Sequence, residues 1–310
     1  WEALQKDQEA NLALSSEETK VLESVAICHE TCKAERDENQ GFPLFVNGRA
    51  GSGKSTLLLY LFARYLKYHY ESGCKTAPPV FFTCSEDLIK KSKEITQTLL
   101  QVNPDYKYKE NKRDMASIVE SAFRVFHSYL YSLLKEEEKK LFPKKKEVSF
   151  SKFRILWKNK CGRHQHSLRD YNPDLSWHVI RTYIKGYGSA DDEEDDGYMT
   201  PEEYKCLSQK ERTVTDRAFE DVHTKVWSWY KSRDYWDNQD LVKHLLTKSD
   251  RIKSDFPAVF CDEAQDFTRM ELELILRLSL FYKRELYSHE LSKRPFAFAG
   301  DEFQTLNPTG

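Results

Sequence analysis

The sequence predicts an α/β fold built on a parallel β-sheet with helices on both faces. Short apolar runs with the character of buried strands recur along the chain, and stretches of helical character separate them. Polar residues directly follow three of these runs, which are residues 42–46, 257–261 and 295–299. Ligands bind at the carboxyl ends of parallel strands, so these three positions are where we expect a functional site.

The composition limits the class of protein. Charged residues make up 32% of the chain but the formal net charge is only -2, so any nucleic-acid-binding surface must be local. Seven cysteines at irregular spacing indicate reduced thiols and not a disulfide framework. No apolar run approaches the roughly 18 residues that a membrane span needs, and no signal peptide opens the chain. We therefore expect an intracellular protein, cytoplasmic or nuclear, with no membrane partner.

The strongest motif is a glycine-rich turn with the sequence GRAGSGKS at residues 48–55. An apolar strand run precedes it and a helical pattern follows, which is the setting that a P-loop requires. The glycines allow a tight turn that brings backbone N–H groups to one point, where phosphate binds. Lys54 is expected to reach the β- and γ-phosphates, and the Ser55 hydroxyl to bind Mg²⁺. The pattern predicts a site for ATP and Mg²⁺ formed by Gly48, Ala50, Gly51, Ser52, Gly53, Lys54, Ser55 and Thr56.

Candidate catalytic residues follow the last two strand runs. Asp262 suits the Walker B role, in which a carboxylate holds Mg²⁺ directly or through water. Glu263 can accept a proton from the attacking water. Gln265 and Gln304 can contact a γ-phosphate or its water, because an amide both donates and accepts hydrogen bonds. Together with Lys54, these residues predict hydrolysis of ATP.

Several motifs, in this order, resemble those of the superfamily 1 helicases of the UvrD/Rep type. The sequences AGSGKS at 50–55, DEAQD at 262–266 and GDEFQ at 300–304 resemble motifs I, II and III. The sequence FHSY at 126–129 resembles the family's nucleic-acid-contacting motif, and residues 82–85 fall where motif Ia contacts the strand. The resemblance implies a RecA-like P-loop NTPase that moves 3′-to-5′ along a single nucleic-acid strand, with DNA favoured over RNA.

The resemblance also implies contacts with that strand. Thr83, His127 and Ser128 are expected to face the sugar–phosphate backbone. The tryptophans and tyrosines between residues 135 and 252 have two interpretations. In the first, one of these aromatic side chains stacks on a base of the nucleic acid. In the second, they pack together as a helical core, which is the more common use of aromatic residues at helical spacing.

Composition and resemblance together predict the domain organisation. Residues 1–134 form the first part of the RecA-like core, residues 135–252 a mainly helical insertion, and residues 253–310 the second part of the core. The chain starts without Met and stops just after a motif, so we expect a piece of a longer protein. The second RecA-like domain is expected outside this piece. In related P-loop enzymes an arginine supplied from across the nucleotide site accelerates phosphoryl transfer by ~10³ to 10⁵. We therefore expect the piece to bind nucleotide but to hydrolyse it slowly.

Two departures from the family pattern keep a second function open. The family has an adenine-reading Gln where this chain offers Glu18, and a carboxylate lacks the amide's paired donor and acceptor, so strict adenine preference is not expected. After Gln304 the sequence TLNPTG is closer to large divergent UvrD-like proteins with repeat regions. The alternative is a nucleotide-dependent switch or scaffold that binds ATP without unwinding. A P-loop kinase or transferase is disfavoured, because it leaves motif III without a role.

Overall fold

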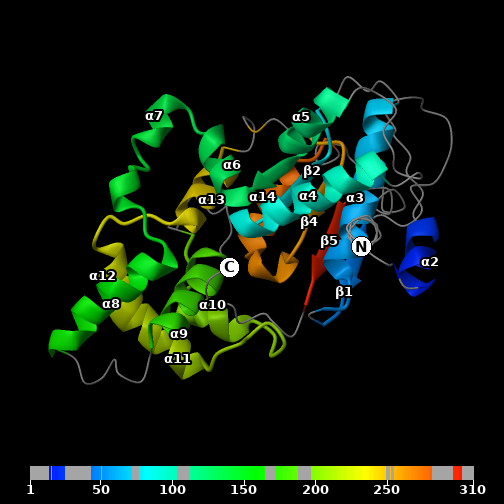
Figure 1. The fold of residues 1–310 in the computed structure, drawn as a ribbon. Helices are drawn as coiled ribbons and strands as arrows, with labels where there is room; N and C mark the ends of the chain where they lie inside the picture. Colours follow the sequence, from blue (N-terminus) through cyan, green and yellow to red (C-terminus); the bar gives the residue numbers. More distant parts are fainter. Residues whose placement is uncertain are drawn as a thin grey trace. The chain divides into compact units, whose positions relative to one another are not determined.

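The computed structural model describes residues 14, 16–24, 43–49, 51–71, 77–102, 112–164, 172–187, 197–248, 252, 255–280 and 296–301 (Figure 1). The chain divides into two compact units. Unit 1 comprises Trp1–Tyr129, Lys253–Asp266 and Ile275–Thr305, and unit 2 comprises Leu130–Ile252, Phe267–Leu274 and Leu306–Gly310. The domain boundaries expected from the sequence stay a prediction.

Unit 1 is built around a five-stranded sheet in the order β1-β5-β4-β2-β3 (Figure 1). Every pair of neighbouring strands is parallel, which confirms the predicted α/β class. All five strands therefore end at the same edge of the sheet. The strands are β1 Leu44–Asn47, β2 Val80–Thr83, β3 Phe123–Val125, β4 Val259–Cys261 and β5 Phe296–Gly300.

Helix α3 (Lys54–Glu71) packs on one face of this sheet. Its Phe62 is fully buried and contacts three aromatic rings, each on a different strand. The ring centroids of Phe81, Phe123 and Phe260 lie 5.3, 4.9 and 5.2 Å from that of Phe62. The strand register pairs Phe81 with both Phe123 and Phe260, so the three rings share one face. Phe62 thus anchors the helix that begins at the glycine-rich turn.

The opposite face of the sheet also contacts a helix. Phe82 follows Phe81 in β2 and so points the other way. Its ring lies 5.5 Å from the rings of Phe126 and Tyr129, both from α6. The prediction of helices on both faces is therefore confirmed. Besides α3, the helices with residues in unit 1 are α2 Ser16–Ser24, α4 Glu86–Val102, α5 Lys112–Ala122, α6 Phe126–Leu133, η6 Ala264–Asp266 and α14 Arg269–Arg277.

The elements that begin and end within unit 2 are helices, as far as the structure describes them. Two of them, η3 and η4, are π-helical segments that continue α-helices. None of the described helices is both long and apolar enough to cross a membrane. The elements are α7 Glu136–Lys139, η1 Lys144–Lys146, α8 Phe150–His164, α9 Pro173–His178, η3 Val179–Lys185, α10 Pro201–Cys206, α11 Asp216–Asp221, η4 Val222–Trp227, α12 Ser228–Lys231 and α13 Asn238–Leu246.

Aromatic side chains form much of the core of unit 2. Trp177, Tyr183, Tyr204 and Tyr230 are at most 5% exposed and belong to one cluster of buried residues. The rings of Tyr204 and Phe219 stack with centroids 4.2 Å apart. The interpretation of these aromatic residues as a helical core is confirmed for these positions.

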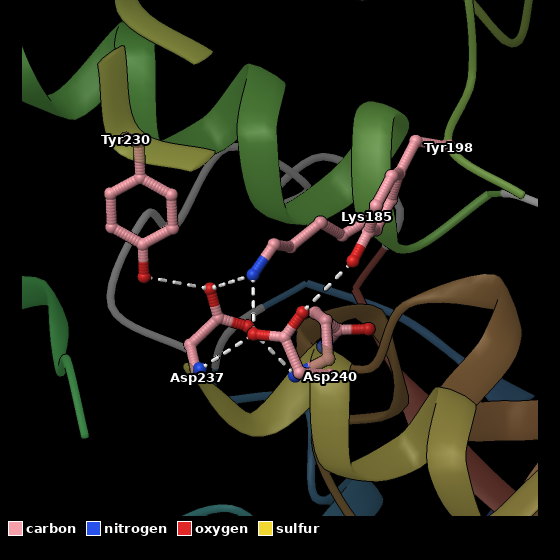
Figure 2. A network of polar contacts seen from close by, with 6 residues as sticks. Lys185, Tyr198, Tyr230, Asp237 and Asp240 are labelled. Atoms are coloured by element: carbon pink, nitrogen blue, oxygen red, sulfur yellow. Dashed lines mark hydrogen bonds and ion pairs between the residues drawn. The ribbon is translucent and has the colours of Figure 1, made fainter. Parts of the chain in front are cut away.

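A buried ion cluster joins η3 to α13 (Figure 2). The ammonium of Lys185, a residue that is 2% exposed, donates to Asp237 Oδ2 at 2.7 Å and to Asp240 Oδ2 at 2.5 Å. The hydroxyl of Tyr230 donates to Asp237 at 3.1 Å, and that of Tyr198 to Asp240 at 3.3 Å. Burial alone would lower the pKa of Lys185, but the two carboxylates raise it, so the lysine stays charged.

Candidate functional site

The glycine-rich turn lies between β1 and α3. Gly51 and Gly53 have φ angles of 78° and 82°, in the left-handed region that glycine adopts without strain. The backbone N–H of Ser52 donates to the carbonyl of Arg49 at 3.1 Å and closes the turn. The first N–H groups of α3, an 18-residue helix, have no intrahelical partner and can bind an anion here. Ala50 lies outside the described residues.

Lys54 and Ser55 begin α3. The Lys54 ammonium donates to the carbonyl oxygens of Gly48 at 2.6 Å and Arg49 at 2.8 Å, which holds the charge at the turn. The Ser55 hydroxyl donates to Asp262 Oδ1 at 3.1 Å, although these residues are 207 positions apart in the sequence. The parallel sheet thus brings the glycine-rich turn and the Asp-Glu motif together.

Asp262 directly follows β4 and is 3% exposed. Its backbone N–H donates to the carbonyl of Phe82 at 3.1 Å, which fixes the end of the strand. Burial raises the pKa of Asp262, while the hydrogen bond from Ser55 lowers it and the charge of Glu263 raises it again. A nearby cation stabilises such a buried carboxylate. Hydroxyl and carboxylate oxygens suit Mg²⁺, so the pair Ser55 and Asp262 fits this ion.

Glu263 and Gln265 connect the end of β4 to the end of β5. Glu263 has a φ of 51°, which is uncommon for a residue with a Cβ atom. Gln265 Nε2 donates to Glu263 Oε2 at 2.7 Å, and Gln265 Oε1 accepts from the Asp301 N–H at 3.0 Å. A Cβ atom on Gly300 would lie 2.9 Å from Gln265 Oε1, so a side chain at position 300 would displace this amide. One amide thus links the candidate base to the start of motif III.

The sequence did not predict this link. It assigned Gln265 to the γ-phosphate and singled out neither Gly300 nor Asp301 for a role. The sequence feature that pointed to these two residues was their place at the end of a strand run, where ligands bind in parallel sheets. Gln304, the other candidate amide, lies outside the described residues.

The candidate nucleic-acid contacts lie at the carboxyl ends of β2 and β3. Thr83 ends β2 and is 1% exposed, and its hydroxyl accepts a hydrogen bond from the Ser85 N–H at 3.3 Å. His127 is half-buried and Ser128 is exposed, and both lie in the first turn of α6. The register pairs Thr83 with Val125, the residue that ends β3, so these residues gather at the edge where the strands end.

The positions of two further residues near the ends of the strands, Arg124 and Glu18, were not predicted from the sequence. The guanidinium of Arg124 lies over the ring of Tyr129, 4.9 Å from its centroid, next to the candidate strand contacts. Glu18 of α2, which the sequence offers where the family has an adenine-reading Gln, has its carboxylate against Gly53 of the glycine-rich turn.

The family model of the UvrD/REP helicase N-terminal domain matches residues 31–306 of the chain. This range includes the glycine-rich turn, the Asp-Glu motif and the strand ends described above. Helix α2 with Glu18 precedes the matched range.

Proposed function

Because this chain belongs to the UvrD/REP helicase N-terminal domain family, we propose that it is the ATP-binding part of a motor that moves along single-stranded nucleic acid. The family is one of nucleic-acid-dependent ATPases and helicases that use ATP with a divalent metal ion. We propose 3′-to-5′ movement, with DNA favoured over RNA as the track. The observation that most supports this proposal is the hydrogen bond between Ser55 and Asp262, which joins the two halves of the nucleotide site.

The proposed chemistry assigns one task to each residue of the site. Lys54 turns from the carbonyls of its own loop to the β- and γ-phosphates, where its charge offsets that of the transition state. Ser55 and Asp262 would hold Mg²⁺, which would neutralise phosphate charge. Glu263 accepts a proton from the attacking water, whose oxygen bonds to the γ-phosphorus as the bond to the β–γ bridging oxygen breaks. The products are ADP and inorganic phosphate.

We propose that residues at the carboxyl ends of the strands couple ATP hydrolysis to movement along the nucleic acid. Gln265 contacts Glu263 and the first residue after β5, so a change at the γ-phosphate can reach motif III through one amide. The strand β4 that positions Asp262 pairs with β2, which ends at Thr83. We propose that Thr83, His127 and Ser128 contact the sugar–phosphate backbone beyond this edge.

Rapid hydrolysis requires a second RecA-like domain in this proposal. In related P-loop enzymes an arginine supplied across the cleft accelerates phosphoryl transfer by ~10³ to 10⁵. We therefore expect residues 1–310 alone to bind ATP and to turn it over slowly, and a protein with both RecA-like domains to turn it over fast.

The test is ATP hydrolysis by such a two-domain protein, with and without single-stranded DNA or RNA. We expect stimulation by the strand, with DNA the better polymer. The matched control is Glu263→Gln, which keeps the size of the side chain but removes the base and should lower the rate by about 10² to 10⁴. Equal rates with and without either polymer would contradict a motor.

The alternative is a nucleotide-dependent switch or scaffold that binds ATP without unwinding. One observation favours it. The Glu18 carboxylate lies at the glycine-rich turn, in the part of the chain where the family resemblance leads us to expect an adenine-reading amide. ATP binding with no response of hydrolysis to single strands would support this alternative.

A further inference from the structure

Glu18 lies against the phosphate-binding turn. A Cβ atom built on Gly53 would overlap the Glu18 carboxylate, so this side chain fills the space beside the glycine. Helix α2 is held in this position by contacts with α3. Leu22 is 6% exposed and belongs to the core that contains α3, and Arg64 Nη1 donates to the Leu22 carbonyl at 2.9 Å. Glu18 and Leu22 are one turn apart, so both face α3.

A carboxylate is unexpected on this face of α2. Leu14, Val21 and Leu22 pack in or against the core of unit 1, and with position 18 they form a stripe at helical spacing. The stripe predicts an apolar residue at position 18. Glu17, by contrast, is exposed. Glu17 and Glu18 both lie in the first turn of α2, where a negative charge is favourable, and Glu18 in addition lies against Gly53 of the glycine-rich turn.

The surroundings of Glu18 attract negative charge. Gly53 directly precedes α3, whose N-terminal N–H groups and dipole favour an anion. The Lys54 ammonium is bound to two carbonyls of the same turn. A carboxylate here interacts with the same partial charges that bind phosphate. Two anions at one such place repel, and the repulsion is stronger for a half-buried carboxylate such as that of Glu18 than it is in water.

We propose that Glu18 is a selectivity residue of the nucleotide site, which lowers the affinity of the glycine-rich turn for polyphosphates according to their charge. The inference rests on the proposed function, because it takes ATP as the ligand of this turn. The triphosphate displaces the carboxylate from Gly53 when it binds. The discrimination acts on phosphate charge and not on the base, so ATP and GTP are disfavoured equally, and ADP is disfavoured less.

The test compares nucleotide affinities of the 310-residue chain and two variants by isothermal titration in the presence of Mg²⁺. Glu18→Gln removes the charge and keeps the shape, and Glu17→Gln removes a charge from the exposed side of the same helix. We expect Glu18→Gln to raise the affinities for ATP and GTP by the same factor, about 10-fold, and that for ADP by less. The gain should shrink as salt is added. Glu17→Gln should bind like the wild type.

Three results would overturn the inference. They are unchanged affinity in Glu18→Gln, weaker affinity, or an altered ratio of ATP to GTP affinity, which would assign base recognition to Glu18. Thermal unfolding verifies that each variant is folded. Glu18→Asp, which keeps the charge but withdraws it from Gly53, provides a second variant and should show a smaller gain. Absence of ATP binding in both proteins contradicts the proposed function itself, whereas equal and measurable binding in both contradicts only the inference.

Discussion

At the scale of single residues, the site depends on contacts that tolerate little change. Glu263 holds a left-handed backbone conformation with φ of 51°, and Gln265 bonds to its carboxylate at 2.7 Å. Non-glycine residues in this region store strain, which is common where a side chain must point at a reacting group. The amide of Gln265 is in turn positioned by the Asp301 N–H and by the lack of a side chain at Gly300.

We predict that Gly300→Ala slows hydrolysis without weakening nucleotide binding. The new methyl group would lie 2.9 Å from Gln265 Oε1 and displace the amide that positions Glu263. A misplaced catalytic group costs about 10- to 100-fold in rate. Hydrolysis and ATP affinity are measured in parallel, with Gln265→Ala as the comparison. A normal rate in Gly300→Ala would show that the amide has no part in positioning the base.

At the scale of elements, helices are joined by buried polar groups as well as by apolar packing. His178 is 8% exposed and lies at the junction of α9 and η3, with Nε2 2.8 Å from Thr213 Oγ1. Burial, with a smaller effect of Arg181, lowers the pKa of His178 from 6.5 to about 4. Between these values the unfolded chain binds a proton that the folded chain does not, so stability falls as the pH falls through this window.

We predict that the protein loses stability as the pH falls and that the lowered pKa of His178 causes part of this loss. From the two pKa values, about 2 kcal/mol of unfolding free energy should be lost between pH 7 and pH 5. Urea unfolding followed by tryptophan fluorescence reports mainly on unit 2. The loss should be smaller in His178→Gln, in which the other titrating groups are unchanged. An equal loss of unfolding free energy in the wild type and in His178→Gln would mean that other groups cause the pH dependence.

A second prediction at this scale concerns the ion cluster in Figure 2. Lys185→Met leaves the buried carboxylate of Asp237 and the half-buried carboxylate of Asp240 without their cation, whose nitrogen lies 2.7 and 2.5 Å from them in the wild type. Breaking a buried pair from one side costs about 3 to 5 kcal/mol. The same urea experiment measures this loss, with exposed Lys210→Met as the control. Equal stability of the two variants would mean that the cluster contributes little.

At the scale of the whole molecule, local chemistry explains which features could be predicted from the sequence. The glycine-rich turn could be predicted because glycine is needed at two left-handed positions, Gly51 and Gly53, and a helix must follow. Asp262 could be placed near Ser55, because the strands before both residues are parallel and end at one edge. The strand order could not be derived, since the neighbour of β1 is β5, from the far end of the chain.

Long-range side-chain contacts account for what the sequence did not predict. The link from Gln265 to Asp301 depends on two loops that meet only in the folded sheet. The contact of Glu18 with Gly53 depends on how α2 packs on α3.

The central claim is that the glycine-rich turn and the Asp-Glu motif form one site for ATP and Mg²⁺. The most direct measurement is titration of ATP into this chain with and without Mg²⁺, for the wild type, Lys54→Ala and Asp262→Asn. We predict binding that Mg²⁺ strengthens in the wild type, loss of binding in Lys54→Ala, and binding that no longer responds to Mg²⁺ in Asp262→Asn. Equal, Mg²⁺-dependent binding by all three proteins would contradict the claim.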